Sequence, residues 1–534
     1  MSSFEHNPIF GKNVIETLSE GMYDNPLFLF REYVQNSADA IDSAISIGIL
    51  NKQEAQININ IDVEKREIVF QDNGIGIPNA KVNALLANIG DSEKDRLVNK
   101  GFRGIGRLGG LGYCKIVRFE TSYNGEDIKT IMEWDAHELH KILADKNTRI
   151  DAGEVIKRIT TVTIKNCDIH EHYFQVTLID INETSNDLLD IEDVRKYLSM
   201  VSPVPFDYER FHFVDTIEKF IQENQLPELN EYNIFLNGDE IRKGYETPLN
   251  IEDNKQPIEI LNVACRLLKD NNQIIGWYWF CISKFEGVIP TKCWQRCIRL
   301  RKSNIQIGEA DCLSNHPKRG QALWKEDRGN NYFLGEIHAI DPDLIPNSRR
   351  DYFNQDSACR RFETVLATEF KNLHKLYHDA STIRSATEQI KQATTERQNF
   401  NEKVKSGVFL DIKEKQKAEQ KVESEEKKAE EARKRLDKIK EKVTDKTQGD
   451  IVSAQVLDSY ENLIEESNDN TENTTTLSET KNVPEKTKDA DKYAKVNKKT
   501  RKILHDVFSV IDKMLPEGQA EPLKEAIIKR VSHS

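Results

Sequence analysis

The sequence contains little that would place the chain in a membrane. Its longest apolar run, Ile274–Ile282, is nine residues long and is interrupted by Gly276, whereas a helix that spans a bilayer needs about 20 residues. We therefore expect no membrane association and interpret this run as a buried strand. Residues 1–10 also lack a basic stretch followed by an apolar one, so we predict no secretory signal and a cytoplasmic location.

Cysteine is sparse as well. Eight cysteines are spread over 534 residues, which is too few and too dispersed for a disulfide framework. The closest pair, Cys293 and Cys297, has no second Cys or His pair at the spacing of a zinc site. We expect these thiols to be free and the chain to bind no metal through cysteine.

Charge is plentiful but unevenly distributed. Charged residues make up 31% of the sequence, above the typical quarter, and the net charge of −13 disfavours a uniformly basic nucleic-acid binder. Residues 411–445 hold 12 basic and 11 acidic residues and contain no Gly or Pro. Val422, Ala429 and Leu436 recur there every seven residues, which indicates a coiled coil or a helical hairpin, with a lone charged helix as the alternative.

The first string with candidate chemistry lies on a predicted helix. Asn25–Gly48 begins with Asn-Pro, a helix start, and ends at Gly, a helix stop. Within REYVQNSADAID, residues 31–42, Glu32 and Asn36 are four residues apart, which places a carboxylate and an amide on one helical face. By itself this pattern is also typical of a solvated polar face.

Two strings that contain glycine follow. Asp72-Asn73-Gly74-Ile75-Gly76 comes directly after the strand pattern Glu67–Gln71. Glycines beside a carboxylate let the backbone approach a flat ligand, although such a string is also a turn signal. Residues 101–112, GFRGIGRLGGLG, contain six glycines, and the amide groups of such a loop can surround phosphate oxygens. No strand pattern precedes this loop, so a Rossmann dinucleotide site is disfavoured.

In this order and spacing, the three strings resemble the nucleotide-binding motifs of the GHKL ATPase superfamily. That superfamily includes the heat-shock protein 90 chaperones, type II topoisomerases, MutL, MORC proteins and histidine kinases. The string ITTVTI, residues 159–164, is similar to the strand that carries the adenine-contacting threonine, which would be Thr160, with Thr161 as the alternative. The resemblance covers about residues 10–170 and implies an α/β fold, an α+β sandwich of the Bergerat type.

The resemblance also implies a role for each motif residue. Glu32 would be the general base that activates the attacking water, and Asn36 would supply an oxygen to Mg²⁺, which takes few protein ligands besides phosphate and water oxygens. Asp72 would accept a hydrogen bond from the adenine amino group and so favour ATP over GTP. Residues 88–106 would form a mobile lid over the phosphates. The implied ATP-binding residues are Asn36, Asp72, Asn73, Gly74, Gly76, Gly101, Gly104, Gly106 and Thr160.

A later string suggests the branch of the superfamily. LIPNSRRDYF, residues 344–353, resembles the middle-domain loop with which heat-shock protein 90 places an arginine at the γ-phosphate. Arg349 is the first choice for this catalytic arginine and Arg350 the second; pairing of both with neighbouring aspartates on a surface loop is the alternative. MutL, MORC proteins and topoisomerases use a lysine instead, for which Lys302 is the candidate. Histidine kinases are disfavoured because only 31 residues precede Glu32.

Together the patterns divide the chain into five regions. These are an ATP-binding domain at 1–204, a second α/β middle domain that supplies the arginine at 205–378, a charged helical or coiled-coil segment at 379–446, a disordered linker at 447–500 and a helical hairpin at 501–534. We expect the apolar face of that hairpin to dock on a partner or on the body of the protein.

Three functions agree with these features. The first is an ATPase of the heat-shock protein 90 type, whose lid closure and domain docking remodel or hold protein partners. The second is a MORC- or MutL-like clamp on nucleic acid, for which a basic cluster would be the footprint: Arg296, Arg299, Arg301 and Lys302. The third is a nucleotide-gated scaffold that scarcely hydrolyses ATP. Homodimerisation that depends on ATP is compatible with each of them.

Overall fold

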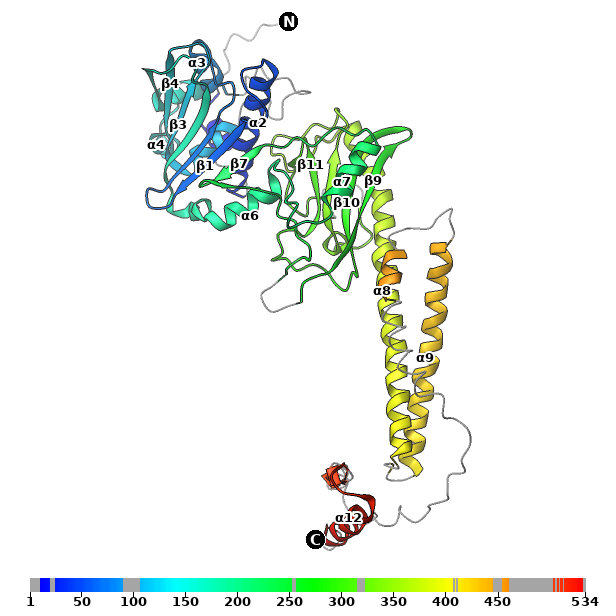
Figure 1. Ribbon diagram of the computed structural model, residues 1–534. Helices are drawn as coiled ribbons and strands as arrows, with labels where there is room; N and C mark the ends of the chain where they lie inside the picture. The colour runs from blue at the N-terminus through cyan, green and yellow to red at the C-terminus, as the bar shows by residue number, and fades with distance from the viewer. Residues whose placement is uncertain are drawn as a thin grey trace. The chain divides into compact units, whose positions relative to one another are not determined.

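The structure is a computed structural model. It describes residues 10–19, 25–89, 106–251, 256–314, 322–406, 409, 412–444, 454–460 and most of 503–531. The chain forms two compact units, Met1–Lys375 and Leu376–Ser534 (Figure 1). The first unit is built from two β-sheets with helices, and the described part of the second is helical.

An eight-stranded sheet forms the centre of the N-terminal half of the first unit. Its strand order is β5-β4-β3-β6-β2-β1-β7-β8, and every neighbouring pair is antiparallel except β1 and β7. The strands are β1 (Gln56–Asp62), β2 (Glu67–Asp72), β3 (Cys114–Ser122), β4 (Ile128–Asp135), β5 (Thr160–Asn166), β6 (Tyr173–Ile181), β7 (Asn233–Leu236) and β8 (Asp239–Glu240).

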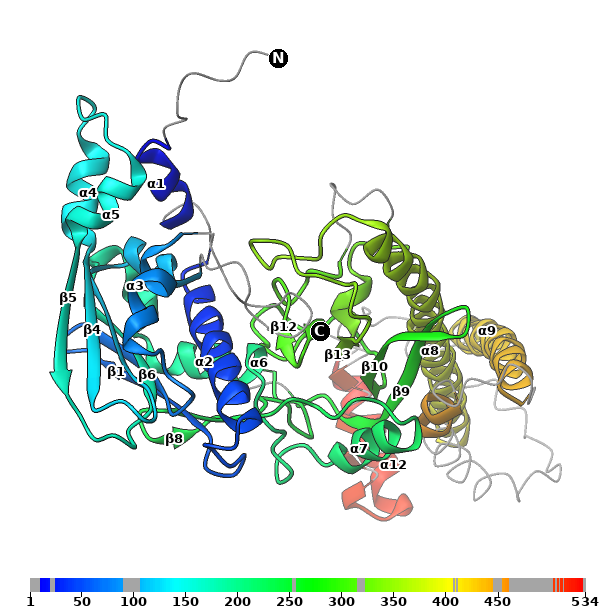
Figure 2. The same ribbon diagram turned by 90° about the horizontal axis from the view of Figure 1, so that it is seen from above.

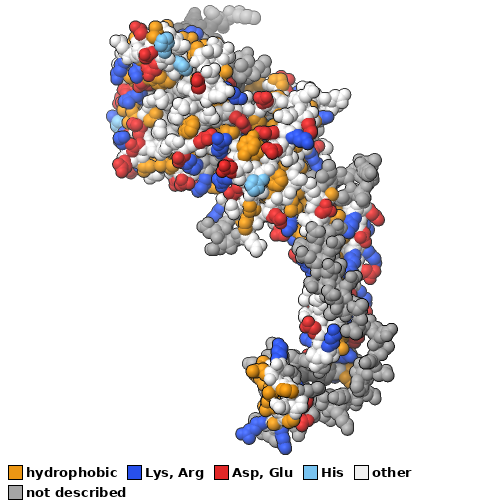
Figure 3. Space-filling model, viewed as in Figure 1, with side chains coloured by type: hydrophobic (Ala, Val, Ile, Leu, Met, Phe, Trp, Pro, Cys, Tyr) orange, Lys and Arg blue, Asp and Glu red, His pale blue; other side chains and the backbone are white. Residues whose placement is uncertain are grey.

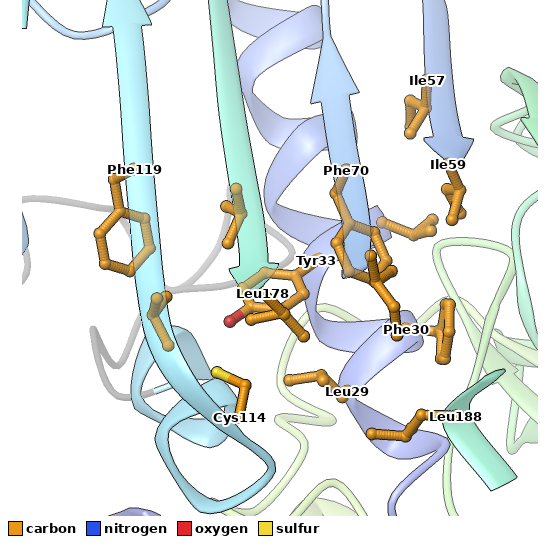
Figure 4. Close-up of a cluster of buried hydrophobic side chains, with 14 of the residues drawn as sticks. Leu29, Phe30, Tyr33, Ile57, Ile59, Phe70, Cys114, Phe119, Leu178 and Leu188 are labelled. Atoms are coloured by element: carbon orange, nitrogen blue, oxygen red, sulfur yellow. The ribbon is translucent and has the colours of Figure 1, made fainter. Parts of the chain in front are cut away.

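Alternating side chains of this sheet pack against one long helix. The predicted helix at 25–48 is α2 (Phe28–Ser46), and it ends before Gly48, whose φ is +77°. Phe70 of β2 lies against Phe30 and Tyr33 of α2, with ring centroids 5.2 and 4.8 Å away. Figures 2 and 4 show α2 across the sheet and the apolar cluster between them. These contacts fix the position of α2 on the sheet, and with it the predicted motif at 31–42.

In the described residues of this half, five shorter helices pack around the sheet. They are α1 (Asn13–Ser19), α3 (Asn79–Ala87), α4 (Ala136–Ala144), α5 (Ala152–Ile159) and α6 (Ile191–Val201). Asp135, Asp151 and Asp190 cap α4, α5 and α6 by accepting hydrogen bonds from backbone N–H groups of the first turn. A single apolar core joins these helices to the sheet.

The structure differs from the predicted domain boundary at residue 204. Strand β7, at Asn233–Leu236, pairs in parallel with β1, so that Ile57 lies opposite Ile234. Residues 233–240 therefore complete the first sheet, although the helix α7 (Val214–Glu223), which precedes them, packs in the core of the second sheet. The chain crosses between the two halves more than once, which a boundary drawn from local sequence composition does not detect.

A five-stranded sheet forms the other half of the first unit. Its order is β12-β11-β13-β10-β9, with the strands β9 (Ile260–Asp270), β10 (Gln273–Ser283), β11 (Cys297–Lys302), β12 (Ile305–Gln306) and β13 (Leu334–Ala339). The predicted buried strand at 274–282 is β10, which is buried from residue 275 to its end. The α/β fold class predicted from the sequence is thus confirmed.

The central strand β10 is covered by helices. The rings of Phe220 on α7 and Trp277 on β10 lie 6.1 Å apart. The long helix α8 (Ser357–Lys405) also contacts this half, because the Tyr278 hydroxyl donates to Glu369 at 2.8 Å. Phe370 of α8 stacks on Trp324 with ring centroids 4.3 Å apart.

In the second unit, α8 continues beside α9 (Ile412–Thr444) as an antiparallel helical hairpin (Figure 1). Arg397 pairs with Glu426, and Arg435 donates to Gln389. The seven-residue repeat predicted at 411–445 is buried, as the low exposures of Val422, Ala429, Ala432, Leu436 and Ile439 show. Residues 412–444 therefore form a single helix that packs against α8, and not a lone helix.

The predicted linker at 447–500 lies outside the described residues except for 454–460, which is helical. Within the predicted C-terminal hairpin, Leu504 and Phe508 form a small core with Ile527 and Ile528 of α12 (Glu517–Val531). Residues 503–514 also expose apolar side chains, among them Val510 and Met514, of which Met514 is 77% exposed. Figure 3 shows hydrophobic side chains on the surface of the C-terminal part. Over the part of the chain that the structure describes, no helix combines the length and the low polarity needed to span a membrane.

Candidate nucleotide site

One face of α2 gathers the three predicted motifs. Glu32, Asn36 and Ala40 follow one another at intervals of four residues on that face. The backbone carbonyl of Ala40 accepts a hydrogen bond from the N–H of Ile75 at 3.1 Å. At the other end of the face, a Cβ added to Gly106 would lie 2.8 Å from Oε2 of Glu32. Asn36 lies between these two contacts and is half-buried.

The turn after β2 requires its glycines. Asp72, the last residue of β2, is 1% exposed, and its Oδ1 accepts from the N–H of Gly74 at 3.0 Å. A Cβ on Gly74 would lie 2.6 Å from the carbonyl carbon of Ala40. Gly76 has a φ of +70°, and a Cβ there would lie 1.9 Å from the Ser122 carbonyl oxygen. Side chains are therefore excluded at both positions, and the turn lies directly on α2 and on the sheet.

Asn73 is used differently from its neighbours. Its Oδ1 accepts from the N–H of Gln56 at 2.9 Å, and its Nδ2 donates to the Glu54 carbonyl at 2.7 Å. The side chain thereby ties the turn to the start of β1. Asn73 therefore has a structural role in this turn, independent of any contact with a ligand.

The structure separates Thr160 from the other predicted site residues. Thr160 begins β5, the edge strand, and three strands lie between β5 and β2, which carries Asp72. At about 4.8 Å per strand, this places Thr160 roughly 19 Å from Asp72. The alternative, Thr161, lies on the same strand and is exposed. Neither residue is brought to the site.

A different threonine occupies the row of side chains that contains Asp72. Phe174 of β6 is directly opposite Asp72, and Thr121 of β3 is directly opposite Phe174. Thr121 is 1% exposed; its Oγ1 accepts from the N–H of Ile77 at 2.8 Å and donates to the Tyr173 carbonyl at 3.0 Å. The sequence did not single out Thr121. Its place at the end of a strand pattern was visible, but the pairing that brings it near Asp72 was not.

Glu32 is buried between two arginines. It is 7% exposed, and its Oε1 lies 3.8 Å from Nε of Arg350 and 3.9 Å from Nη2 of Arg31. Among the described residues, Glu32 Oε1 and all three side-chain nitrogens of Arg31 lack a hydrogen-bond partner. Arg31 is 1% exposed and lies over the ring of Phe28 at 4.3 Å. Such a set of buried, unsatisfied charged atoms indicates a polar ligand or water between them.

The loop at 345–353 decides which arginine approaches Glu32. Arg350 has a φ of +54°, and its carbonyl accepts from the N–H of Gly308 at 2.7 Å, which fixes the loop next to β12. Arg350 is 8% exposed, whereas Arg349, the first choice from the sequence, is exposed. The third candidate, Lys302, donates to the Asp341 carbonyl at 2.6 Å, and burial lowers the pKa of Lys302 to about 8.

Two predicted ligand residues, Gly101 and Gly104, lie outside the described residues, as does most of the predicted lid at 88–106. Gly106, the first described residue after that gap, begins the 3-10 helix η1 (Gly106–Gly112). A Cβ on Gly110 would lie 2.7 Å from the hydroxyl of Tyr33. The second half of this glycine-rich string is thus packed tightly against α2.

The basic cluster that would mark a nucleic-acid surface is largely internal. Arg301 is fully buried, and its guanidinium donates to the carbonyls of Asn304 and Met200 and pairs with Glu336 at 2.6 Å. Arg299 is 4% exposed and donates to Gln306 at 2.7 Å. Guanidinium groups buried in this way cannot form an exposed surface for a nucleic acid, so Arg299 and Arg301 do not form the predicted footprint.

Glu336 is the centre of a buried ionic cluster in the second sheet. Its carboxylate accepts from Lys243 Nζ at 2.9 Å and lies 3.1 Å from Nε2 of His338. Burial alone would raise the pKa of Glu336, but Arg301, Lys243 and His338 hold it well below its ordinary value. Burial and the charge of Arg301 lower the pKa of Lys243 to about 7, and burial lowers that of His338 to about 4.

The donor set along α2 fits ATP and Mg²⁺. Asp72 presents a buried carboxylate beside a turn whose positions 74 and 76 have no side chain, which suits a flat base. Asn36 offers an oxygen ligand of the kind that Mg²⁺ accepts. Arg31 and Arg350 offer guanidinium groups near the position where a terminal phosphate would meet Glu32.

Parts of this chain resemble known proteins. Residues 28–167 match the family model described as histidine kinase-, DNA gyrase B-, and HSP90-like ATPase. The chaperone protein HtpG of Ruthia magnifica subsp. Calyptogena magnifica is 34% identical over 85 residues, 15% of this chain and 14% of that protein. HtpG of Burkholderia ambifaria is 26% identical over 172 residues, 29% of this chain and 26% of that protein.

A relative of another kind also matches. The putative type II restriction enzyme HgiDII of Herpetosiphon aurantiacus is 31% identical over 132 residues, 23% of this chain and 19% of that protein. The chain thus spans about a quarter or less of the length of these relatives. The family match at 28–167, the antiparallel sheet covered by α2 and the motif residues along that helix are all consistent with a GHKL-type ATPase domain in the N-terminal half.

Proposed function

We propose that the protein hydrolyses ATP and couples this reaction to a rearrangement of its two α/β halves that acts on protein partners. The observation that carries the proposal is the 3.8 Å separation between Nε of Arg350 and Oε1 of Glu32. The two residues lie 318 positions apart in sequence, and both are buried. Such an arrangement makes a site that is complete only when both halves are together.

Glu32 acts as the general base in this proposal. Its Oε1 accepts the proton of the attacking water, which must lie within hydrogen-bond reach of it. Arg31, at 3.9 Å from the same oxygen, orients the carboxylate. The close packing of Gly106 on Glu32 closes the other side of the carboxylate and restricts its rotation.

Arg350 stabilises the negative charge that develops on the transferred phosphoryl group. A guanidinium suits this purpose because it donates two parallel hydrogen bonds to phosphate oxygens. The left-handed backbone at Arg350 directs its side chain toward α2 and costs about 1–2 kcal/mol. Strain of this size is typically retained at functional sites.

Asn36 and Asp72 bind the two ends of the nucleotide. Asn36 would hold Mg²⁺, which when bound neutralises phosphate charge. The buried carboxylate of Asp72 accepts from the amino group of adenine, and the glycines at 74 and 76 let the base approach the backbone. Thr121 holds the N–H of Ile77 and so fixes the turn against which the base lies.

Action on protein partners is the finer part of the proposal. Its support is the similarity to HtpG chaperone proteins, together with an exposed apolar surface at 503–514. The similarity to a putative restriction enzyme supports a second candidate, an ATPase that acts on DNA. The predicted nucleic-acid footprint included Arg299 and Arg301, and their burial weighs against this second candidate.

The test is ATP turnover by the full chain and by Glu32→Gln. We expect the variant to lose about 10²- to 10⁴-fold in kcat while its affinity for ATP stays within about twofold. Equal turnover in both proteins would overturn the role of Glu32. Turnover near background in the unmodified protein would favour a scaffold.

The partner class is tested in the same assay by adding unfolded protein or duplex DNA. Stimulation by unfolded protein supports the leading proposal. If DNA stimulates turnover and the stimulation is lost as the salt concentration rises, the ATPase that acts on DNA becomes the better proposal.

A further inference from the structure

A cavity of about 360 Å³ lies between the two halves of the first unit. No residue of the turn at 72–76 is among its described lining residues. The C-terminal part of α6 and the segment before α2 form one side of it, and the second sheet with the loop before β11 forms the other. Its lining includes Asn25 and Tyr197 on the first side and Trp294, Arg296, Arg299 and Glu309 on the second. A cavity of this size holds a small organic ligand.

Two buried side chains that line this cavity could each donate one more hydrogen bond. Arg299 is 4% exposed; its Nη1 donates to Gln306 at 2.7 Å and its Nη2 to the Trp294 carbonyl, but its Nε has no partner among the described residues. Tyr197 is 5% exposed, and within the same part of the chain its hydroxyl makes no hydrogen bond either. Burial raises the pKa of Tyr197, so at neutral pH the hydroxyl is a donor. Two buried donors without acceptors beside one cavity call for an acceptor inside it.

The charge of the lining selects the type of acceptor. Lys292, Arg296 and Arg299 are basic, while Glu309 is the acidic residue among the described lining residues. Glu309 already accepts a hydrogen bond from Asn25 at 3.2 Å, which links the two sides of the cavity. Trp294, 36% exposed, adds an aromatic surface. This combination of excess positive charge and free donors suits an anion with several oxygen acceptors.

We propose that this cavity is a second ligand site, which binds a small polyanion through its carboxylate or phosphate oxygens to Arg299, Tyr197 and Arg296. Such a ligand would contact both halves of the first unit and so favour the arrangement in which Arg350 meets Glu32. Binding does not depend on the proposed ATPase activity. Only the expected effect on turnover rests on the proposed function.

The test is isothermal titration calorimetry of the full chain without ATP or metal, with sodium pyrophosphate as the phosphate probe and citrate as the carboxylate probe. We expect at least one probe to bind with a dissociation constant below about 1 mM, and the stronger of the two identifies the preferred group. Tyr197→Phe should weaken binding about fivefold or more and, because it removes a buried hydroxyl without a partner, should leave the melting temperature equal or higher.

Further variants distinguish binding in this cavity from binding elsewhere on the protein. Arg296→Gln should weaken the probe about as much as Tyr197→Phe does, whereas Lys219→Gln, an exposed change on α7, should not. Asn36→Ala should leave probe binding intact, because Asn36 lies in the nucleotide site. Absence of binding by both probes, or equal binding by Tyr197→Phe, would overturn the proposal and leave water as the acceptor. A catalytically inactive protein that still binds the probe would overturn the proposed function alone.

Discussion

Nε of Arg350 lies 3.8 Å from Oε1 of Glu32, and this contact joins the loop after β13 to the first turns of α2. The neighbouring Arg349 is exposed. Because the two arginines differ by one position and are chemically identical, they form a matched pair for testing which of them serves the site.

Arg350→Ala should lower kcat for ATP by about 10³-fold or more, the range measured for arginines that stabilise phosphoryl transfer. Arg349→Ala should change kcat by less than about threefold. Steady-state phosphate release by each variant measures both effects. The reverse order of the two effects would return the catalytic role to Arg349 and contradict the geometry of the loop.

The turn at Gly76 should be intolerant of any side chain. Gly76→Ala must adopt a φ near +70° and place its Cβ against the Ser122 carbonyl, so we expect the free energy of unfolding to fall by at least about 2 kcal/mol. Gly125→Ala is the control, since Gly125 has a φ of +96° but open space around it. That change should cost about 1 kcal/mol. Urea denaturation compares them, and equal losses would mean that the close packing of Gly76 contributes nothing.

Thr121, not Thr160, should matter for ATP affinity. Thr121→Val removes the acceptor of the Ile77 N–H beside the base-binding turn, and we expect the dissociation constant for ATP to rise about fivefold to tenfold. Thr160→Val, on the edge strand β5, should leave it unchanged. Titration with a fluorescent ATP analogue gives both constants. A loss of affinity in Thr160→Val but not in Thr121→Val would show that the base binds near β5, and it would contradict this prediction.

The buried His338 should make the protein sensitive to acid. Burial lowers the pKa of His338 to about 4, below its value of about 6.5 in an unfolded chain. Between these values the unfolded chain binds a proton that the folded chain does not. The free energy of unfolding therefore decreases as the pH falls from 6.5 to 4, by up to about 1.4 kcal/mol per pH unit.

This contribution can be isolated by substitution. His338→Gln should flatten the dependence of unfolding free energy on pH between 6.5 and 4, whereas His170→Gln, at an exposed position, should not change it. Urea denaturation at several pH values provides the curves. Parallel curves for His338→Gln and the unmodified protein would indicate that this histidine is not the group that titrates.

Much of the candidate site was accessible from sequence because its chemistry is local. The spacing of Glu32 and Asn36 on a helix depends only on helical periodicity. The turn at Asp72 depends on a strand end and on glycines that follow it directly. In the structure, the turn after Asp72 and the start of the second glycine-rich string both lie against α2.

Other residues could not be located in this way. Thr160 lies in a clear strand pattern, but its strand β5 is at the edge of the sheet. Strand order could not be predicted because it is set by pairing between distant segments. The same reason explains β7, which lies beyond the predicted boundary at 204 and yet pairs with β1. Arg349 and Arg350 are chemically identical neighbours, and only the folded loop, in which Arg350 has a φ of +54°, shows that Arg350 is the buried one.

The sequence by itself determined the helix at 25–48, the buried strand at 274–282, the glycine turn after residue 72 and the resemblance to a GHKL-type ATPase domain, because each of these depends on residues close together in the chain. Only the tertiary structure decided which threonine lies in the row of Asp72 and which arginine approaches Glu32. It also decided that the basic residues Arg299 and Arg301 are internal. Those outcomes depend on long-range packing and backbone direction, which no local pattern encodes.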